Sequence, residues 1–181
     1  MFSCMRRTTG WVSPTIPDFD AAGTLFTNGT HVLAGYQKDL TKPTVSGIGG
    51  KREGSETYMQ TAIRETVEEL FHIDSVPAVL IRRIILALEP TRIEKMGSYV
   101  LVIYNFKDLE KILEIVRNEI KVSPVYKVLP KTVSDLMLER IPVVEPRAEV
   151  THLCLVPLVK DARMDLSFQE DIDLVVRNVL K

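Results

Sequence analysis

The segment from residue 49 to residue 70, GGKREGSETYMQTAIRETVEEL, concentrates carboxylates behind a pair of glycines. On a helix that advances about 100° per residue, Glu65, Glu68 and Glu69 fall on one face. The opposite face is apolar and carries Met59, Ile63, Val67 and Leu70. The segment therefore predicts a helix that packs one side against a core and presents three acids on the other side.

Three carboxylates at this spacing repel one another unless water or cations offset their charge. Clustered oxygen ligands suit Mg²⁺ or Mn²⁺, hard ions that keep some of their waters and also bind substrate phosphate. A helix face rich in glutamate is also the usual composition of a solvated surface. Composition and helical phase alone leave both interpretations open.

Local signals before the acidic residues indicate the elements that position them. Thr57 can cap the first helical turn while Gln60 reciprocates, as in a capping box, so a helix is expected over 58–70. The preceding segment, 41–54, is rich in Gly, Ser, Thr and Pro. That composition predicts a functional loop with at most a short strand.

The rest of the chain interleaves strand and helix patterns. Asn28 and Gly29 join two apolar runs within 21–37 and predict an antiparallel hairpin. Further strands are expected at 77–89, 98–106 and 151–159, with a loop at 89–97. Apolar residues recur at helical spacing in 108–119, 167–181 and, more weakly, 132–140. The pattern predicts one α/β domain over 1–181, with a central mixed β-sheet flanked by helices, and residues 1–17 as an N-terminal extension.

Charge and composition narrow the classes of function. The 181 residues include 23 Lys plus Arg and 24 Asp plus Glu, so the net charge of −1 supplies no global basic field for a nucleic-acid backbone. No segment approaches the roughly 20 apolar residues of a membrane span, and the N-terminus lacks the apolar run of a secretory signal. With only Cys4 and Cys154, a disulfide framework is not expected, and a reducing, cytoplasmic compartment is predicted.

Residues 50–72 resemble the Nudix box, whose pattern is Gly, five residues, Glu, seven residues, then Arg-Glu-apolar-any-Glu-Glu-any-Gly-apolar. The residues that match its spacing are Gly50, Glu56, Arg64, Glu65, Glu68 and Glu69. The chain departs from the pattern at three positions. Thr66 replaces an apolar residue, Phe71 replaces the last glycine, and His72 replaces the final apolar residue. A one-residue insertion that gives Ile73 the apolar role is an alternative. The resemblance covers most of the chain from about residue 18, although only the box is specific.

The resemblance implies a fold, a Nudix-like α-β-α sandwich, as well as an activity and a cofactor. Nudix hydrolases cleave the diphosphate of a nucleoside diphosphate linked to another moiety, and they use a divalent metal. Carried over by position, Glu65, Glu68 and Glu69 would bind Mg²⁺ or Mn²⁺, and Glu65 would also help to activate water. The expected protein is therefore a metal-dependent pyrophosphohydrolase of a small nucleotide or nucleotide derivative.

The remaining box residues would organise this site. Arg64 and Glu56 resemble the family's structural ion pair, which orients the loop against the helix. The backbone of Gly49 and Gly50 would approach the metal or the phosphate, where a side chain would obstruct, so both glycines are candidate substrate-binding residues.

Many family members place another acid outside the box. The candidates here are Glu145 and Glu149, with Glu94 behind them, although each is more often a plain surface glutamate. Recognition of a purine usually needs an aromatic side chain on which the base stacks. The candidates are Trp11, Tyr36, Phe71 and Tyr99, but such residues more often lie in the core or have no role in binding.

Two other functions remain open. Removal of a 5′ cap or 5′ diphosphate from RNA needs a basic path, whereas the basic residues are sparse and scattered, namely Arg6, Arg7, Arg82, Arg83, Arg92 and Lys95. A non-catalytic Nudix module would bind a nucleotide or a partner protein. Such modules commonly lose box acids, but this chain keeps all four. No membrane partner is expected, and a homodimer is compatible with the sequence.

Overall fold

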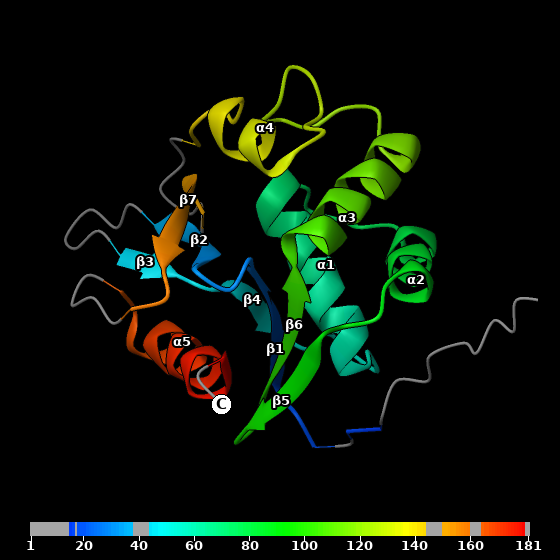
Figure 1. Ribbon diagram of the computed structural model, residues 1–181. Helices are drawn as coiled ribbons and strands as arrows, with labels where there is room; N and C mark the ends of the chain where they lie inside the picture. The colour runs from blue at the N-terminus through cyan, green and yellow to red at the C-terminus, as the bar shows by residue number, and fades with distance from the viewer. Residues whose placement is uncertain (1–14, 17, 38–43, 144–149, 160–163, 180–181) are drawn as a thin grey trace, which may run out of the picture.

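The computed structural model describes residues 15–16, 18–37, 44–143, 150–159 and 164–179 (Figure 1). The strands are β1 (Ala21–Thr27), β2 (His31–Gln37), β3 (Thr44–Ser46), β4 (Ile48–Lys51), β5 (Arg92–Met96), β6 (Tyr99–Asn105) and β7 (His152–Pro157). The helices are α1 (Tyr58–Phe71), α2 (Ala78–Ala87), α3 (Phe106–Glu119), α4 (Val133–Leu138) and α5 (Leu166–Val179). Within these ranges, no helix is both long and apolar enough to span a membrane.

The strands form one mixed sheet with the order β3-β2-β1-β6-β5, in which β4 also pairs with β1 and β7 with β2. β1 runs parallel to β6 and antiparallel to β2 and β4. Figure 1 shows α5 on one side of the sheet and α1, α2 and α3 on the other. The predicted α/β class, with a central mixed sheet flanked by helices, is confirmed.

Alternating side chains of the central strands fill two cores. On β1, Ala22 and Phe26 belong to the larger core, which includes residues of α1 to α4, whereas Leu25 belongs to the smaller core with α5. On β6, Val102 and Ile103 divide between the cores in the same way, because successive side chains of a strand point to opposite faces. α1 packs against β1 and β4, which fixes its apolar face to the centre of the sheet.

Several elements lie where the sequence predicts them. The hairpin turns at Asn28 and Gly29, and Gly29 has a φ of +86°, the left-handed conformation that glycine adopts readily. The helices expected at 108–119, 132–140 and 167–181 are α3, α4 and α5. The strands expected at 98–106 and 151–159 are β6 and β7.

The prediction of a strand at 77–89 is wrong, because residues 78–87 form helix α2. Its buried residues Leu80, Ile81 and Ile84 recur at helical spacing, and the two arginines between them are exposed. A short, continuous apolar run does not distinguish a buried strand from a buried helix by periodicity. The β-branched composition favoured a strand, but packing against the larger core selects the helix.

The loops expected at 89–97 and 41–54 contain more strand than predicted. The first contains β5, which forms a hairpin with β6 through Gly97, whose φ is +60°. The second contains both β3 and β4, instead of at most one short strand. These strands are too short or too polar for a clear local signal, and their pairing partners lie elsewhere in the sheet.

Candidate functional site

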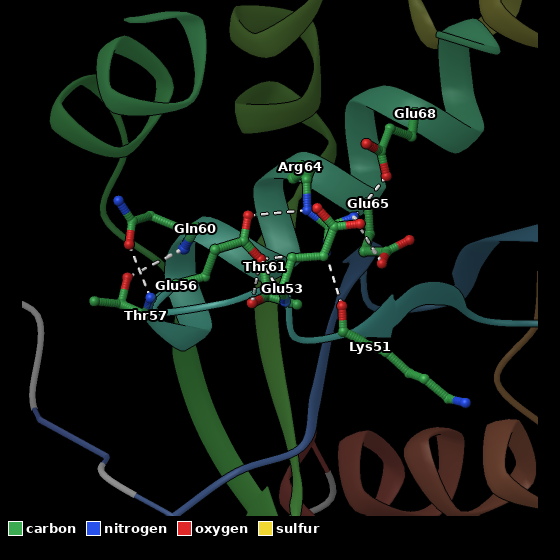
Figure 2. A network of polar contacts seen from close by, with 9 residues as sticks. All are labelled: Lys51, Glu53, Glu56, Thr57, Gln60, Thr61, Arg64, Glu65 and Glu68. Atoms are coloured by element: carbon green, nitrogen blue, oxygen red, sulfur yellow. Dashed lines mark hydrogen bonds and ion pairs between the residues drawn. The ribbon is translucent and has the colours of Figure 1, made fainter. Parts of the chain in front are cut away.

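Helix α1 begins with the capping box that the sequence predicts (Figure 2). Thr57 Oγ1 accepts a hydrogen bond from the Gln60 backbone nitrogen at 3.3 Å, and Gln60 Oε1 accepts one from the Thr57 nitrogen at 2.8 Å. The cap fixes where the first turn starts and therefore fixes the rotational phase of the helix. Tyr58 and Met59 are buried directly after it, so the following turns present their acids toward the loop that precedes α1.

Arg64 lies at the centre of the acidic residues and is only 6% exposed (Figure 2). Its Nε donates to Glu56 Oε1 at 2.9 Å, and its Nη2 donates to the Lys51 carbonyl at 2.7 Å. Its Nη1 donates to Glu65 Oε1 at 2.9 Å and to Glu68 Oε2 at 2.7 Å. One guanidinium therefore joins the loop to three carboxylates, because its planar fork offers several N–H donors at once.

Glu56 anchors Arg64 from the loop side. Its Oε2 also accepts hydrogen bonds from the Thr61 hydroxyl at 3.0 Å and from the Glu53 nitrogen at 3.2 Å. Burial opposes the charge of Glu56, but the hydrogen bonds from Arg64, Glu53 and Thr61 outweigh it, so the pKa of Glu56 lies below its usual value. Glu56 therefore remains ionised at neutral pH, and the ion pair expected from the sequence is present.

The pKa of Glu68 is also changed by its surroundings. Burial raises the pKa of Glu68 above its ordinary value, and the charges of Glu53 and Glu56 add to this rise, although Arg64 opposes it. Burial is therefore the largest cause that disfavours ionisation of Glu68. Arg64 is the internal cation that offsets part of the charge of Glu56, Glu65 and Glu68.

Strand β4 passes close to its neighbours at two glycines. A Cβ on Gly50 would lie 2.4 Å from Glu65 Oε1, and a Cβ on Gly49 would lie 2.5 Å from the Gly23 Cα. The Gly49 nitrogen donates to Glu69 Oε1 at 3.2 Å. The backbone of both glycines therefore lies against the box carboxylates, a close approach that a side chain would prevent.

These groups line one side of a cleft of about 780 Å³, a volume typical of small-molecule sites. The box side comes from β4 and α1 and includes Gly49, Gly50, Arg64, Glu65, Glu68 and Glu69. The other side comes from the β3–β4 connection, the β5–β6 hairpin and α5. It includes Ser46, Met96, Tyr99, Phe168, Glu170 and Asp171.

Glu170 and Asp171 are cleft residues that the sequence reasoning missed. Asp171 is 5% exposed and lies next to Ile172, a residue of the smaller core. A sequence signal was present, because Phe168, Ile172 and Val175 form an apolar stripe at helical spacing that Asp171 interrupts. A carboxylate on the apolar stripe of an amphipathic helix marks a position that deserves a functional explanation.

Burial changes the ionisation of two groups on the α5 side. Burial raises the pKa of Asp171 to about 7, and the charges of Glu170 and Asp165 add to the rise. Burial also raises the pKa of Tyr99 well above its ordinary value, and the carboxylates of Asp171 and Glu69 contribute. The Tyr99 hydroxyl is therefore a neutral phenol between the acids of α5 and those of α1.

Of the three candidate acids outside the box, only Glu94 lies within the described ranges. Glu145 and Glu149 lie outside the described ranges. Glu94 lies in β5, forms an ion pair with Arg92 at 2.6 Å, and is not among the described residues that line the cleft. Among the described residues, the further acids that line the cleft are Glu53, from the loop before α1, and Glu170 and Asp171, from α5.

The four aromatic residues considered for binding a purine do not lie together in the fold. Trp11 lies outside the described ranges, Tyr36 packs edge-on to His152, and Phe71 is fully buried in the larger core. Tyr99 was not expected to take part in binding, yet it lines the cleft.

The end of α1 explains the departures from the Nudix pattern. Phe71 is the last helical residue and is fully buried, while His72 adopts the left-handed conformation, with φ 52° and ψ 59°. Ile73 packs against the larger core. The left-handed residue and the apolar residue therefore each lie one position later than in the pattern, as the one-residue insertion predicts.

Arg140 satisfies the carbonyls that the end of α1 leaves open. This arginine is 7% exposed and donates to the Leu70 carbonyl and, at 3.0 Å, to the Glu69 carbonyl. Ser123 Oγ donates to the Phe71 carbonyl at 2.6 Å. Side chains from distant segments thus hold the last turn of α1, which carries Glu69, in place.

The carboxylates of Glu65, Glu68 and Glu69 fit Mg²⁺ or Mn²⁺ by their chemistry, because hard cations prefer oxygen ligands. All three line the same cleft, and the glycine backbone of β4 leaves no side chain between the strand and Glu65. In the part of the chain that the structure describes, no three His, Cys, Asp or Glu side chains are already spaced to hold a metal. Arg64 contacts one carboxylate oxygen of Glu65 and one of Glu68.

Comparison with protein-family models gave no match, and no curated protein matched the sequence. Solved structures similar to this chain include two of a bifunctional NMN adenylyltransferase/ADP ribose pyrophosphatase from Francisella tularensis, one of them complexed with AMP and Mn ion. They are 17% and 16% identical, with a TM-score of 0.48, over 92% of this chain and 43% of theirs, so this chain spans less than half of their length. A mutT/nudix family protein from Listeria innocua is 17% identical, with a TM-score of 0.35, over 91% of this chain and 93% of its own.

Proposed function

We propose that this chain is a Nudix-type, divalent-metal-dependent pyrophosphohydrolase that cleaves the diphosphate of a nucleoside diphosphate linked to another moiety. The observation that carries the proposal is the network around Arg64. Glu56, from the loop, and Glu65 and Glu68, from α1, stand at the spacing of the Nudix box and meet at one guanidinium beside the cleft. A merely solvated glutamate face has no need for a buried arginine that orients its acids.

The residues of this site have distinct roles in the proposed reaction. Glu65, Glu68 and Glu69 would hold Mg²⁺ or Mn²⁺, and a bound ion offsets the charge of the diphosphate and lowers the pKa of a bound water. Arg64 orients Glu65 and Glu68, and Glu56 orients Arg64. All of these residues lie in or beside one cleft, and the Gly50 backbone leaves the Glu65 carboxylate the space that a side chain would fill.

Hydrolysis then requires one proton acceptor. Water attacks a phosphorus of the diphosphate, the P–O bond of the anhydride breaks, and the leaving phosphate takes the bonding electrons. Glu65 would accept the proton of the attacking water, because its carboxylate lines the cleft beside Glu68 and Glu69. The two products each end in a phosphate.

A substrate panel tests the proposal. The protein is incubated with Mg²⁺ or Mn²⁺ and nucleoside triphosphates, ADP-ribose, dinucleoside polyphosphates, coenzyme A or capped RNA, and the products are resolved by mass. We expect metal-dependent cleavage of one class, abolished by EDTA and by Glu69→Gln. The matched control Glu110→Gln, an exposed residue of α3, should cleave like wild type.

The same panel separates the alternatives. Cleavage of capped RNA alone, with a rate that falls steeply with salt, would identify the decapping activity. Folded protein that cleaves no member of the panel with either metal would contradict the proposed hydrolysis and favour a binding module.

A further inference from the structure

The α5 side of the cleft differs in composition from the box side. Met96 and Phe168 contribute apolar surface there, and Ser46, Tyr99 and Asp171 contribute polar groups. Sites for small organic groups combine apolar walls with a few convergent polar groups. The α5 side therefore has the composition of a binding surface, beyond what the carboxylates of the box require.

Three polar groups on this side have no hydrogen-bond partner among the described residues. Asp171 is 5% exposed, yet no N–H or O–H group in the described ranges donates to its carboxyl. The Oγ of Ser46 is buried and has no partner in that part of the chain. The Tyr99 hydroxyl, which lies close to the Gly23 backbone, makes no hydrogen bond there either. Asp171 and Tyr99 line the cleft, so their oxygens are available to a ligand there, whereas the Ser46 Oγ is enclosed by protein and is not.

Charge determines which ligand fits them. Asp171 and Glu170 place carboxylates on this side, which disfavours a phosphate there. Burial raises the pKa of Asp171 to about 7, so near neutral pH its carboxyl accepts hydrogen bonds in one form and donates them in the other. The Tyr99 phenol is neutral and can donate as well as accept. The groups together suit an uncharged ligand that carries N–H or O–H donors.

We propose that Asp171 and Tyr99 form a recognition subsite for the uncharged nucleoside part of the substrate, which they bind through its N–H or O–H groups. The inference rests on the function proposed above, because it assigns the other half of the same substrate. The diphosphate lies against the box side, and the nucleoside lies against α5. The amino groups of a base and the hydroxyls of a ribose share the required chemistry.

Binding of uncharged ligands tests the subsite without hydrolysis. Adenosine, guanosine, cytidine, uridine and methyl riboside are titrated into the protein by calorimetry. We expect at least one nucleoside to bind to wild type and its Kd to rise at least tenfold in Asp171→Asn, which keeps the shape of the side chain. The matched control Asp74→Asn, an exposed position between α1 and α2, should stay within twofold of wild type. Binding of nucleosides but not of methyl riboside identifies the base as the recognised group, and equal binding of both identifies the ribose.

The variant Tyr99→Phe tests the subsite independently, because it removes only the hydroxyl. We expect it to raise the Kd of the same nucleoside at least threefold. Absence of binding by every nucleoside and the riboside, or equal affinity of wild type and Asp171→Asn, would overturn the subsite whatever the protein hydrolyses. Nucleoside binding that depends on Asp171, in a protein that cleaves no diphosphate with either metal, would uphold the subsite and contradict the proposed hydrolysis.

Discussion

Arg64 connects residues from two segments of the chain, Glu56 and Lys51 before α1 and Glu65 and Glu68 within it. A lysine would keep the positive charge but would offer one ammonium group in place of a planar fork. It could not reach the loop carbonyl and the carboxylates of both segments together. At the scale of single residues, the position therefore requires the geometry of arginine as well as its charge.

We expect Arg64→Lys to lower turnover by about tenfold to hundredfold, because small displacements of positioning groups are costly to catalysis. Its free energy of unfolding should fall by about 1–3 kcal/mol, because hydrogen bonds to charged groups are lost. Turnover at saturating Mg²⁺ and urea unfolding measure the two effects. The matched control is Arg82→Lys, an exposed position of α2. Equal turnover in the two variants would show that the guanidinium geometry is not needed.

At this scale, the family resemblance predicted one contact, the ion pair of Arg64 with Glu56, and the structure contains it. The helical phase placed Glu65 and Glu68 on one face, but it did not predict that both bond to Arg64. The partners of Arg64 beyond the box were not predictable, because the Lys51 carbonyl enters the network only through the pairing of β4 with β1.

At the scale of elements, the structure of the end of α1 predicts how two substitutions change the free energy of unfolding. His72 is left-handed without being glycine, whereas Phe71 fills the larger core. We expect His72→Gly to raise the free energy of unfolding by about 1 kcal/mol, because glycine adopts this conformation without strain. Phe71→Gly should lower it by about 4 kcal/mol, because it empties a buried site. Chemical unfolding of both variants checks the order, and the reverse order would contradict the one-residue insertion.

The buried Asp171 of helix α5 predicts how the stability of the protein depends on pH. The pKa of Asp171 is about 7 in the folded protein and ordinary in the unfolded chain, so the folded state binds the proton more tightly. This stabilisation is complete below about pH 4 and is lost as the pH rises through about 7. We expect Asp171→Asn to match wild type near pH 4 and to exceed its free energy of unfolding by roughly 2–4 kcal/mol at pH 8.

Urea unfolding of both proteins between pH 4 and pH 8 measures this difference. The control Asp74→Asn should show no such divergence, because Asp74 is exposed. A constant difference between wild type and Asp171→Asn across this range would contradict a raised pKa of Asp171.

The elements were predictable to different degrees. The capping box of α1 and the Asn28-Gly29 turn are local signals, and both are confirmed. The run that forms α2 carries β-branched residues in a continuous apolar stretch, so its sequence did not distinguish helix from strand. β5 was missed because its residues gain their hydrogen bonds from β6, not from a pattern of their own.

At the scale of the whole molecule, the cleft depends on where the sheet brings α1 and α5. The box is a local motif, whereas the α5 side of the cleft is built from three separate segments. A sequence motif can therefore indicate the carboxylates, but only the fold shows that Asp171 and Tyr99 face the same cleft. The class of fold was predictable from the interleaved patterns, because it needs only the order and type of most elements.

Direct binding of Mn²⁺ tests the central claim that the box acids hold a metal. Free Mn²⁺ is followed by electron paramagnetic resonance while the ion is titrated into three proteins. These are wild type, a double variant that combines Glu68→Gln with Glu69→Gln, and the control Glu110→Gln. We predict that wild type and Glu110→Gln deplete the free signal with equal affinity and that the double variant binds at least tenfold more weakly. Equal Mn²⁺ binding by all three proteins, or no binding by folded wild type, would contradict the account.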